Sequence, residues 1–279
     1  SMKSLYWRMV FFLKTRKSRK MRKSLGTNIR AIITQSSNGL FAVDPEDLEV
    51  GEKLRKGGFG LDEIERIKSL ISDDSRVLIV GSHIGSLVIP ISRHCKEVVA
   101  IEANPKTYEL LSLNLRLNDI ENVVSHNIAA SEKTETITFF LNTVNSGGSK
   151  RAPKQSHFMY EYDRPERVEI QAHALDTHLP NHAFDLVLMD IEGSEYFALK
   201  GMSKILQECN SLIVEFLPHH LRNVAAVDAQ TFLKQIPERF TRVTVPSQDV
   251  TLSREEADAF LVKMFREEKG DDGLIFQVK

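Results

Sequence analysis

The stretch VLIVGSHIGS, residues 77–86, determines the class of fold that this chain can adopt. Its apolar run is continuous, as is typical of a strand buried on both faces of a parallel sheet. Gly81 and Gly85 follow, and glycines after a strand allow a tight turn that brings the backbone close to a ligand. A helix that begins there presents free N–H groups to the same ligand. The stretch therefore predicts a strand, a glycine turn and a helix from about Gly85.

Alternating strand and helix patterns continue from this stretch to the C-terminus. Further strands are expected at residues 97–102, 123–128, 136–141, 167–173, 184–190, 211–217, 242–245 and 274–279. Helical patterns separate many of them, for example at 105–118 and 194–206. Regular alternation of this kind predicts a parallel sheet with right-handed crossovers and helices on both faces. We therefore predict an α/β fold, a doubly wound Rossmann-like sheet with additional N-terminal helices.

Differences in charge and pattern divide the chain into three parts. Residues 1–43 hold ten Lys and Arg residues and no acid, whereas the rest of the chain holds 27 basic and 38 acidic residues. Residues 44–75 carry helical patterns, with Asp44 as the expected N-cap and Pro45 in the first turn. The domains that we expect are a basic N-terminal segment (1–43), a helical extension (44–75) and the main domain (76–279).

The basic segment permits two interpretations. Its apolar start, LYWRMVFFL, is followed by KTRKSRKMRK, and such a helix can make peripheral contact with an anionic membrane. In the other interpretation the helix packs Leu5, Met9 and Phe12 onto the domain and ends in a solvated basic tail. The segment does not match a secretory signal, because the charges follow the apolar run and Arg8 interrupts it. We take Met2 as the native start.

Composition excludes several classes of protein. A chain of 279 residues that is 42% hydrophobic can bury a large core without help from metals or disulfides. Its two cysteines, Cys95 and Cys209, form neither a disulfide framework nor a metal-binding spacing, which suits the cytoplasm. No run reaches the ~18 apolar residues of a membrane span. The acidic main part argues against a nucleic-acid partner, since phosphate contacts require a basic face.

An adenosine-containing cofactor is indicated by the residues at the carboxyl ends of the expected strands. Glu102 ends the second strand, where a carboxylate can accept both hydroxyls of a ribose, and Ala103 follows it. Asn127 and Ala129 follow the third strand, at the edge where an adenine ring would lie. A dinucleotide fold requires glycine where this chain has His83, to clear room for a pyrophosphate. S-adenosylmethionine has no phosphate and is therefore the predicted cofactor.

Candidate catalytic residues follow the strand 184–190. Asp190 ends that strand beside the glycine turn, so it is our first candidate to orient or deprotonate an acceptor hydroxyl, with Glu192 second. Asp190 is also expected to border the cofactor. His83, His157 and His219 are alternative bases. Asp190 and Glu192 could together hold a divalent cation, but no fuller ligand set is evident and we predict no metal.

These motifs resemble the FkbM family of S-adenosylmethionine-dependent methyltransferases. The resemblance covers about residues 77–206 and depends on VLIVGSHIGS, AIEANP, HNIAAS, HALDTHL and above all MDIEGSEYFALKG. It implies a class I methyltransferase fold, a seven-stranded, mostly parallel sheet whose last strand, LIFQVK here, is antiparallel. It also implies O-methylation of a sugar, glycan or polyketide-like hydroxyl. By motif match, the cofactor would be lined by Gly81, Ser82, His83, Gly85 and Glu102, with Asp190 at the transfer site.

Two other functions remain open at this point. The chain has Ile79 and His83 where the family pattern DVGANIG has Asp and Asn, which favours a degenerate fold that only binds. An NAD-linked oxidoreductase is the second alternative. The acceptor itself is expected to contact residues 142–167, a long connection with basic and aromatic side chains between two strands.

Overall fold

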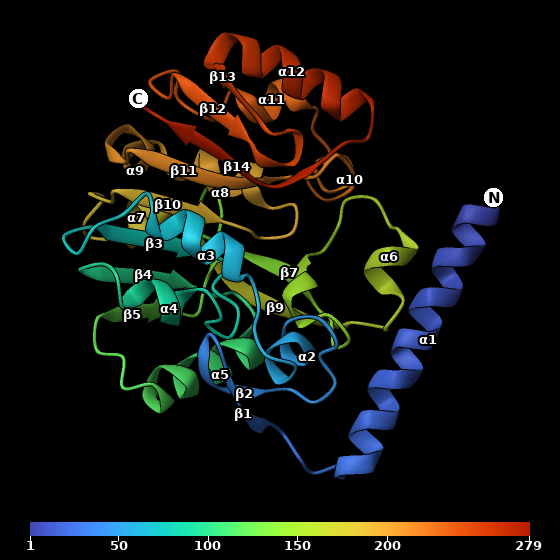
Figure 1. Cartoon of the computed structure of the whole chain (residues 1–279). Coiled ribbons are helices and arrows are strands. Elements are labelled where there is room, and N and C mark those ends of the chain that lie inside the picture. The colour runs from blue at the N-terminus through green and yellow to red at the C-terminus, as the bar shows by residue number, and fades with distance from the viewer.

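The computed structural model describes every residue from Ser1 to Lys279, and its centre is an eight-stranded sheet (Figure 1). Its strands are β3 (Arg76–Val80), β4 (Glu97–Ile101), β5 (Val123–His126), β10 (Leu186–Met189), β11 (Ser211–Phe216), β12 (Arg242–Val245), β13 (Val250–Ser253) and β14 (Asp271–Gln277). Their order across the sheet is β13-β12-β14-β11-β10-β3-β4-β5. The strands from β11 to β5 are parallel, and β14 is antiparallel to β11. The predicted α/β sheet with an antiparallel last strand is therefore confirmed.

The sheet has one strand more than predicted. β13 forms an antiparallel hairpin with β12 at the sheet edge, after a 3-10 turn at Pro246–Gln248 and Asp249 in the left-handed region (φ 51°). The sequence VTLS of β13 is only half-buried, because an edge strand has one neighbour and two partly solvated faces. A strand of this kind lacks the continuous apolar run that identified the central ones.

The prediction that strands 136–141 and 167–173 belong to the main sheet is wrong. They are β7 (Glu135–Leu141) and β9 (Glu166–His173), which pair antiparallel in a separate four-stranded sheet. The other members of that sheet are β6 (Ala129–Ala130) and β8 (Lys150–Arg151). β9 reads ERVEIQAH, with apolar and polar residues in alternation, and this pattern is typical of antiparallel strands that are solvated on one face.

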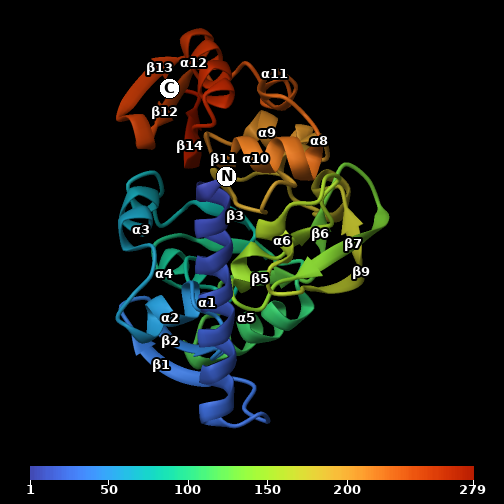
Figure 2. The ribbon, with the colours of Figure 1, turned by 90° about the vertical axis from the view of Figure 1, so that its right-hand side faces the viewer.

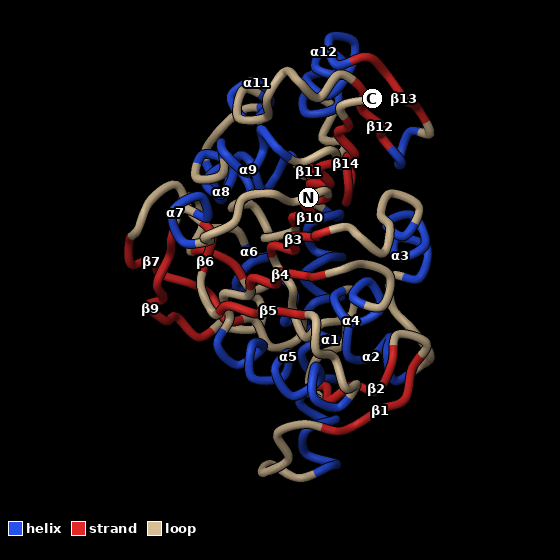
Figure 3. Tube along the Cα trace, turned by 90° about the vertical axis from the view of Figure 1, so that its left-hand side faces the viewer, coloured by secondary structure: helices blue, strands red, loops and turns tan.

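Helices cover both faces of the main sheet, as expected for a doubly wound fold (Figure 3). On one side are α2 (Val50–Arg55), α3 (Leu61–Lys68), α4 (Val88–Ser92) and α5 (Pro105–Leu117). On the other side are α8 (Glu195–Lys200), α9 (Ser203–Glu208), α11 (Ala229–Leu233) and α12 (Arg254–Arg266). Shorter helices are α6 (Phe158–Glu161), α7 (Leu175–His178), α10 (Pro218–His220), a 3-10 turn at Ser146–Gly148 and a π-helical turn at Leu221–Ala225.

Side chains of the central strands alternate between two hydrophobic cores. In β3, Val77 and Ile79 belong to a core of 20 buried residues, and Leu78 and Val80 belong to a core of 33 on the opposite face. This alternation follows from the period of two in a strand. It explains the continuous apolar run of 77–80, because a strand that is covered on both faces requires apolar residues at every position.

The N-terminal part differs from the prediction in two places. Residues 1–43 contain a long helix, α1 (Met2–Leu25), and an unpredicted hairpin of β1 (Ile32–Ser36) and β2 (Gly39–Val43). Asp44 does not cap a helix: its Oδ1 accepts from the N–H of Glu46 in a turn, and α2 begins only at Val50. An Asp side chain that bonds two residues ahead stabilises a turn as readily as a helix start.

Helix α1 lies along one side of the molecule, next to α6 and α2 (Figures 1 and 2). It contacts the domain through Phe11, Lys14, Ser18 and Arg22 rather than through the three predicted residues. Leu5, Met9 and Phe12 are 70%, 53% and 59% exposed, so the expectation that they pack onto the domain is wrong. No helix is both long enough and apolar enough to cross a membrane.

Asn114 of α5 joins the N-terminal hairpin to the glycine turn. Its amide accepts from the N–H of Ala42 (2.7 Å) and donates to the carbonyls of Ala42 (3.2 Å) and Ile84 (2.9 Å). The side chain is fully buried, so no water can replace these bonds. We expect Asn114→Ala to lower the free energy of unfolding by about 2–4 kcal/mol, because three buried backbone groups lose their partner.

Urea denaturation of the variant and the wild type measures this difference. The matched control is Asn210→Ala, at an exposed position without a side-chain hydrogen bond, which should change the stability by less than about 0.5 kcal/mol. Equal stability of the two variants would contradict the assigned role of Asn114.

Candidate active site

The glycine turn after β3 packs closely against the end of β10. Gly81 has φ +90°, and a Cβ atom at this position would lie 1.9 Å from the carbonyl oxygen of Asp190. The N–H groups of Gly81 and Ser82 both donate to the carbonyl of Ile101, at 2.9 and 3.0 Å. Only glycine permits this approach, and it brings the ends of β3, β4 and β10 together.

Glu102, the residue that follows β4, binds the backbone of the glycine turn through its carboxylate. Its two carboxylate oxygens accept from the N–H groups of His83 (2.7 Å) and Asn104 (2.8 Å). Burial raises the pKa of Glu102 to about 7, against the effect of these two hydrogen bonds. The amide of Asn127 donates to the carbonyls of Glu102 (2.8 Å) and Ala103 (3.2 Å) and so holds the same loop from β5.

A small cavity of about 50 Å³ lies over these strand ends. The predicted site residues that line it are Gly81, His83, Glu102, Ala103, Ala129, Asp190 and Glu192. Three others lie outside its wall. Ser82 donates to the carbonyl of Ile79, Gly85 packs under Leu111, and Asn127 holds the Glu102 loop.

The chemistry of the cavity wall is apolar and acidic. Ile101, Ile128, Ile137 and Phe139 supply apolar surface, and no Lys or Arg is part of the lining. A flat apolar base fits such a wall, and an uncharged ribose fits its carboxylates. An anionic pyrophosphate would meet Glu102, Asp190 and Glu192 without a cation to neutralise it. The wall therefore suits a nucleoside cofactor that carries positive charge.

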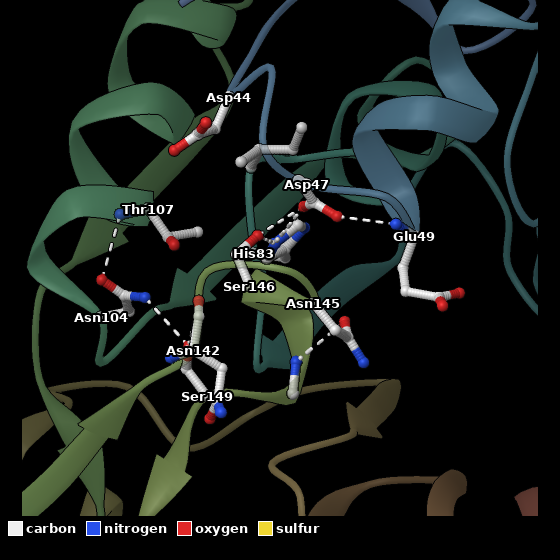
Figure 4. A network of polar contacts seen from close by, with 12 residues as sticks. Asp44, Asp47, Glu49, His83, Asn104, Thr107, Asn142, Asn145, Ser146 and Ser149 are labelled. Atoms are coloured by element: carbon white, nitrogen blue, oxygen red, sulfur yellow. Dashed lines mark hydrogen bonds and ion pairs between the residues drawn. The ribbon is translucent and has the colours of Figure 1, made fainter. Parts of the chain in front are cut away.

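His83 connects the glycine turn to two distant segments (Figure 4). Its Nε2 lies 2.8 Å from the hydroxyl of Ser146, which in turn donates to Asp47 at 2.5 Å. Because the single Ser146 proton is given to the Asp47 carboxylate, His83 donates from Nε2. Burial lowers the pKa of His83 to about 4, so the ring is neutral and its Nδ1 is a buried acceptor without a partner. A cofactor with an amino group could supply the missing donor.

A second cavity shares Asp190, Glu192 and the glycine turn with the first. Its wall adds Glu63, Glu215 and Asp272, and it contains no Lys or Arg. Burial raises the pKa of Asp190, and burial together with the negative charge of Asp190 raises that of Glu192. The Asp190 residue is exposed to solvent in the cavity, although protein atoms and the acids Glu192, Glu215 and Asp272 surround its carboxylate. The two cavities thus share a pair of carboxylates, those of Asp190 and Glu192.

Glu192 belongs to a short chain of titratable groups. Its Oε2 lies 3.4 Å from Nε2 of His220, and Nδ1 of His220 lies 2.9 Å from Oε1 of Glu215. Burial lowers the pKa of His220 and raises that of Glu215. Glu192 itself has φ +53°, a conformation that non-glycine residues seldom adopt. Oxygen and nitrogen ligands from these three residues all lie within 4.8 Å of one another, close enough to hold a metal ion.

Several residues of the site were missed from the sequence. Glu215 follows the same rule as Asp190, because it lies near the carboxyl end of a buried strand, and this signal could have identified it. His220 and Asp47 gave no such signal. They are positioned by the helix α10 and by the loop before α2, whose paths the sequence pattern does not reveal.

The predicted acceptor segment, residues 142–167, has two different roles. Asn145, Ser146, Gly147 and Ser149 border the cavities. Its aromatic residues are largely engaged elsewhere: the Tyr162 ring stacks on Phe11 of α1 at 4.4 Å, and Tyr160 is buried. These two aromatic rings are therefore not free to stack on an acceptor.

The fold and the site define a nucleoside-cofactor enzyme of the doubly wound α/β class. The methyltransferase FkbM domain matches residues 80–245, more than half of the chain. The protein therefore belongs to the FkbM methyltransferase family, as the sequence motifs indicated, and it uses S-adenosylmethionine as methyl donor. This membership decides against an NAD-linked oxidoreductase. No curated protein sequence matches the chain.

The chain also resembles solved structures, at low similarity. TYW2 of M. jannaschii in complex with AdoMet is 15% identical (TM-score 0.38), with 67% of this chain and 63% of that one covered. TYW2 of P. horikoshii in complex with MeSAdo is 17% identical (TM-score 0.42; 77% and 62% covered). An rRNA methylase of Streptococcus thermophilus is 11% identical (TM-score 0.45; 78% and 95% covered). The chain spans less than two thirds of both TYW2 proteins.

The pKa of Glu102 leads to a test of its predicted contact with the ribose. Ribose hydroxyls donate to a carboxylate, so binding favours the ionised form, which predominates above pH about 7 and is lost as the pH falls through that value. If Glu102 takes the ribose, the dissociation constant of S-adenosylhomocysteine should rise about tenfold between pH 8 and pH 6. Calorimetric titration at both pH values measures it.

The Glu102→Gln variant tests whether Glu102 causes this pH dependence of binding. This variant cannot ionise, so we expect weaker binding with little dependence on pH over the same range. Glu208→Gln, at an exposed position without an ion pair, is the matched control and should behave as the wild type. A Glu102→Gln variant that keeps the full pH dependence would assign it to another acid, such as Asp47, whose pKa is raised to about 6.

Proposed function

We propose that the protein transfers the methyl group to a hydroxyl oxygen of a glycan or a hydroxylated small molecule. The observation that supports this proposal is the meeting of two cavities at Asp190 and Glu192, carboxylates whose pKa values are raised by burial. A hydroxyl must lose its proton to become a good nucleophile, whereas a neutral amine can attack without prior deprotonation. A wall of basic carboxylates therefore suits an oxygen acceptor better than a nitrogen one.

The two compartments suit the two substrates. The first, with apolar residues and Glu102, fits the adenosine part of the cofactor, and the second fits the acceptor. The bound cofactor supplies a methyl group on a positively charged sulfur with a neutral leaving group. Asp190 and Glu192, at the shared wall, would stabilise that charge and orient the acceptor hydroxyl in line with the methyl carbon.

The chain Glu192–His220–Glu215 can take up the proton that the acceptor hydroxyl would lose. A neutral imidazole between two carboxyl groups can donate to only one of them, so a proton is shared among the three groups. A proton taken up by Glu192 can then pass through His220 toward Glu215, over contacts of 3.4 and 2.9 Å. This chain would keep Glu192 available as a base during turnover.

The charge of the acceptor compartment favours an uncharged substrate. Glu63, Asp190, Glu192, Glu215 and Asp272 line it. Hydroxyl groups can donate hydrogen bonds to such a wall, whereas phosphates would be repelled. The rRNA methylase among the solved structures acts on nucleic acid by its name. For this chain we propose a neutral polyol instead, and RNA is the comparison substrate in the assay.

The proposal is tested by the loss of the base. We expect Asp190→Asn and Glu192→Gln each to lower methyl transfer by roughly 10²–10⁴-fold, the usual contribution of a positioned general base. Affinity for S-adenosylhomocysteine should change far less. The measurement uses a tritiated methyl donor with a panel of glycans and hydroxylated small molecules, and with tRNA and rRNA as comparison acceptors.

Asp73→Asn is the matched control, because Asp73 is exposed and forms no ion pair. A variant at Asp190 that is as active as the wild type would exclude it as base. Cofactor binding by the wild type without transfer to any hydroxylated acceptor, but with transfer to RNA, would contradict the proposed acceptor. Cofactor binding without any transfer would favour a module that only binds.

We expect that activity does not require a metal ion. Lys150 is buried, donates to the carbonyl of Gly148 and lies 5.0 Å from the ring of Tyr160. Burial lowers the pKa of Lys150, and the nearby carboxylates of Glu192 and Glu215 act against this shift. Addition of EDTA should leave the rate unchanged. Inhibition that Mg²⁺ reverses would instead assign Glu192, Glu215 and His220 as metal ligands.

A further inference from the structure

The first half of α1 exposes a row of large apolar side chains to solvent. Met2, Leu5, Met9, Phe12 and Leu13 are 90%, 70%, 53%, 59% and 53% exposed. Single exposed apolar residues are common on protein surfaces, but a contiguous group on one helix marks a contact with a partner or a membrane. No other element of the protein covers this group.

The exposed row is on the side of α1 that faces away from the domain. Phe11, Ser18 and Arg22, which hold the helix on the domain, are separated by seven and four positions and therefore share one face of the helix. Leu5, Met9 and Phe12 are likewise spaced by four and three positions and occupy the opposite face. Figure 2 shows α1 on the outside of the molecule. The helix is thus fixed by one side, and the apolar row on its other side is exposed to solvent.

The second half of the same face is cationic. Arg16, Arg19, Lys20 and Lys23 are exposed, and none of them forms an ion pair with the protein. Three further basic residues of α1 pair with acids of the domain: Lys14 with Glu49 (3.0 Å), Lys17 with Glu52 (2.6 Å), and Arg22 with Asp44 and Glu46. The unpaired cations therefore form a separate group that follows the apolar row along the helix.

A groove between α1 and α6 adds a third feature. It has a volume of about 420 Å³, and its wall includes Arg8, Arg16, Arg19 and Arg164, together with the rings of Phe12 and Phe158. The Arg8 guanidinium lies 4.8 Å from the centre of the Phe158 ring. None of the four arginines forms an ion pair, although Glu161 also borders the groove. Guanidinium groups beside apolar rings match a phosphate attached to an acyl chain.

We propose that α1 binds the surface of an anionic phospholipid bilayer, with the apolar row in the interface and the unpaired cations at the headgroups. An apolar row beside a cationic group is the combination that such a surface recognises. Nucleic acid would account for the cations but leave the apolar row in water. The occupant is therefore a lipid surface, and this inference is independent of the methyl acceptor.

Vesicle sedimentation of the full chain tests the proposal. The probes are vesicles of phosphatidylcholine alone and vesicles of equal parts phosphatidylcholine and phosphatidylserine. We expect the protein to pellet with the mixed vesicles and much less with the neutral ones.

Charge variants identify the surface that binds. The fourfold variant Arg16→Gln, Arg19→Gln, Lys20→Gln, Lys23→Gln should bind mixed vesicles at least about tenfold more weakly. A control with the same net charge changes four exposed, unpaired lysines on the domain: Lys96→Gln, Lys133→Gln, Lys204→Gln, Lys234→Gln. The control should bind as the wild type. Equal binding by both fourfold variants would overturn the proposal.

An apolar variant tests the other half of the face. Leu5→Ser, Met9→Ser, Phe12→Ser together should weaken binding to mixed vesicles, while S-adenosylhomocysteine affinity stays unchanged. Failure of the wild type to bind either vesicle overturns the proposal. If the wild type is then a dimer in size-exclusion chromatography and this variant a monomer, the apolar row is instead a contact between two copies of the chain.

Discussion

The contact on which the site depends is the approach of Gly81 to the carbonyl oxygen of Asp190. A Cβ atom would be 1.9 Å from that oxygen, so the backbone of the turn can reach β10 only because residue 81 is glycine. The same turn is tied to β4 through the carbonyl of Ile101 and the carboxylate of Glu102. Three strand ends are thereby fixed around one point, and both cavities open beside it.

The acidity of that point is the basis of the cofactor and acceptor preferences that we propose. Carboxylates line both cavities without a Lys or Arg in either wall, so a cationic methyl donor is favoured and a pyrophosphate is not. Burial raises the pKa of Glu192 and Glu215, and the proposed transfer of a hydroxyl proton depends on these same groups. In this proposal, one electrostatic property serves both cofactor selection and chemistry.

The sequence revealed those features that depend on local pattern. We could predict the sheet, the turn and the family from the apolar run 77–80, the glycine at 81 and the acids at strand ends. A strand that is buried on both faces requires a continuous apolar run, and such a run is easily recognised. Strands that are solvated on one face have a less distinct sequence pattern, so β7 and β9 were assigned to the wrong sheet. His220 lies near Glu192 because α10 follows β11 at that edge of the sheet. Helix α1 packs with the face that carries Phe11, because Phe11 stacks on Tyr162. Tertiary contacts of this kind leave no pattern in the local sequence.

The central claim is that an acidic site built on the Gly81 turn selects a cationic nucleoside cofactor over a dinucleotide. Calorimetric titration of the full chain at pH 8 with S-adenosylmethionine and, separately, with NADH tests it most directly. The account predicts saturable binding of S-adenosylmethionine and no detectable binding of NADH. Binding of NADH with comparable affinity, or no binding of S-adenosylmethionine, would contradict it.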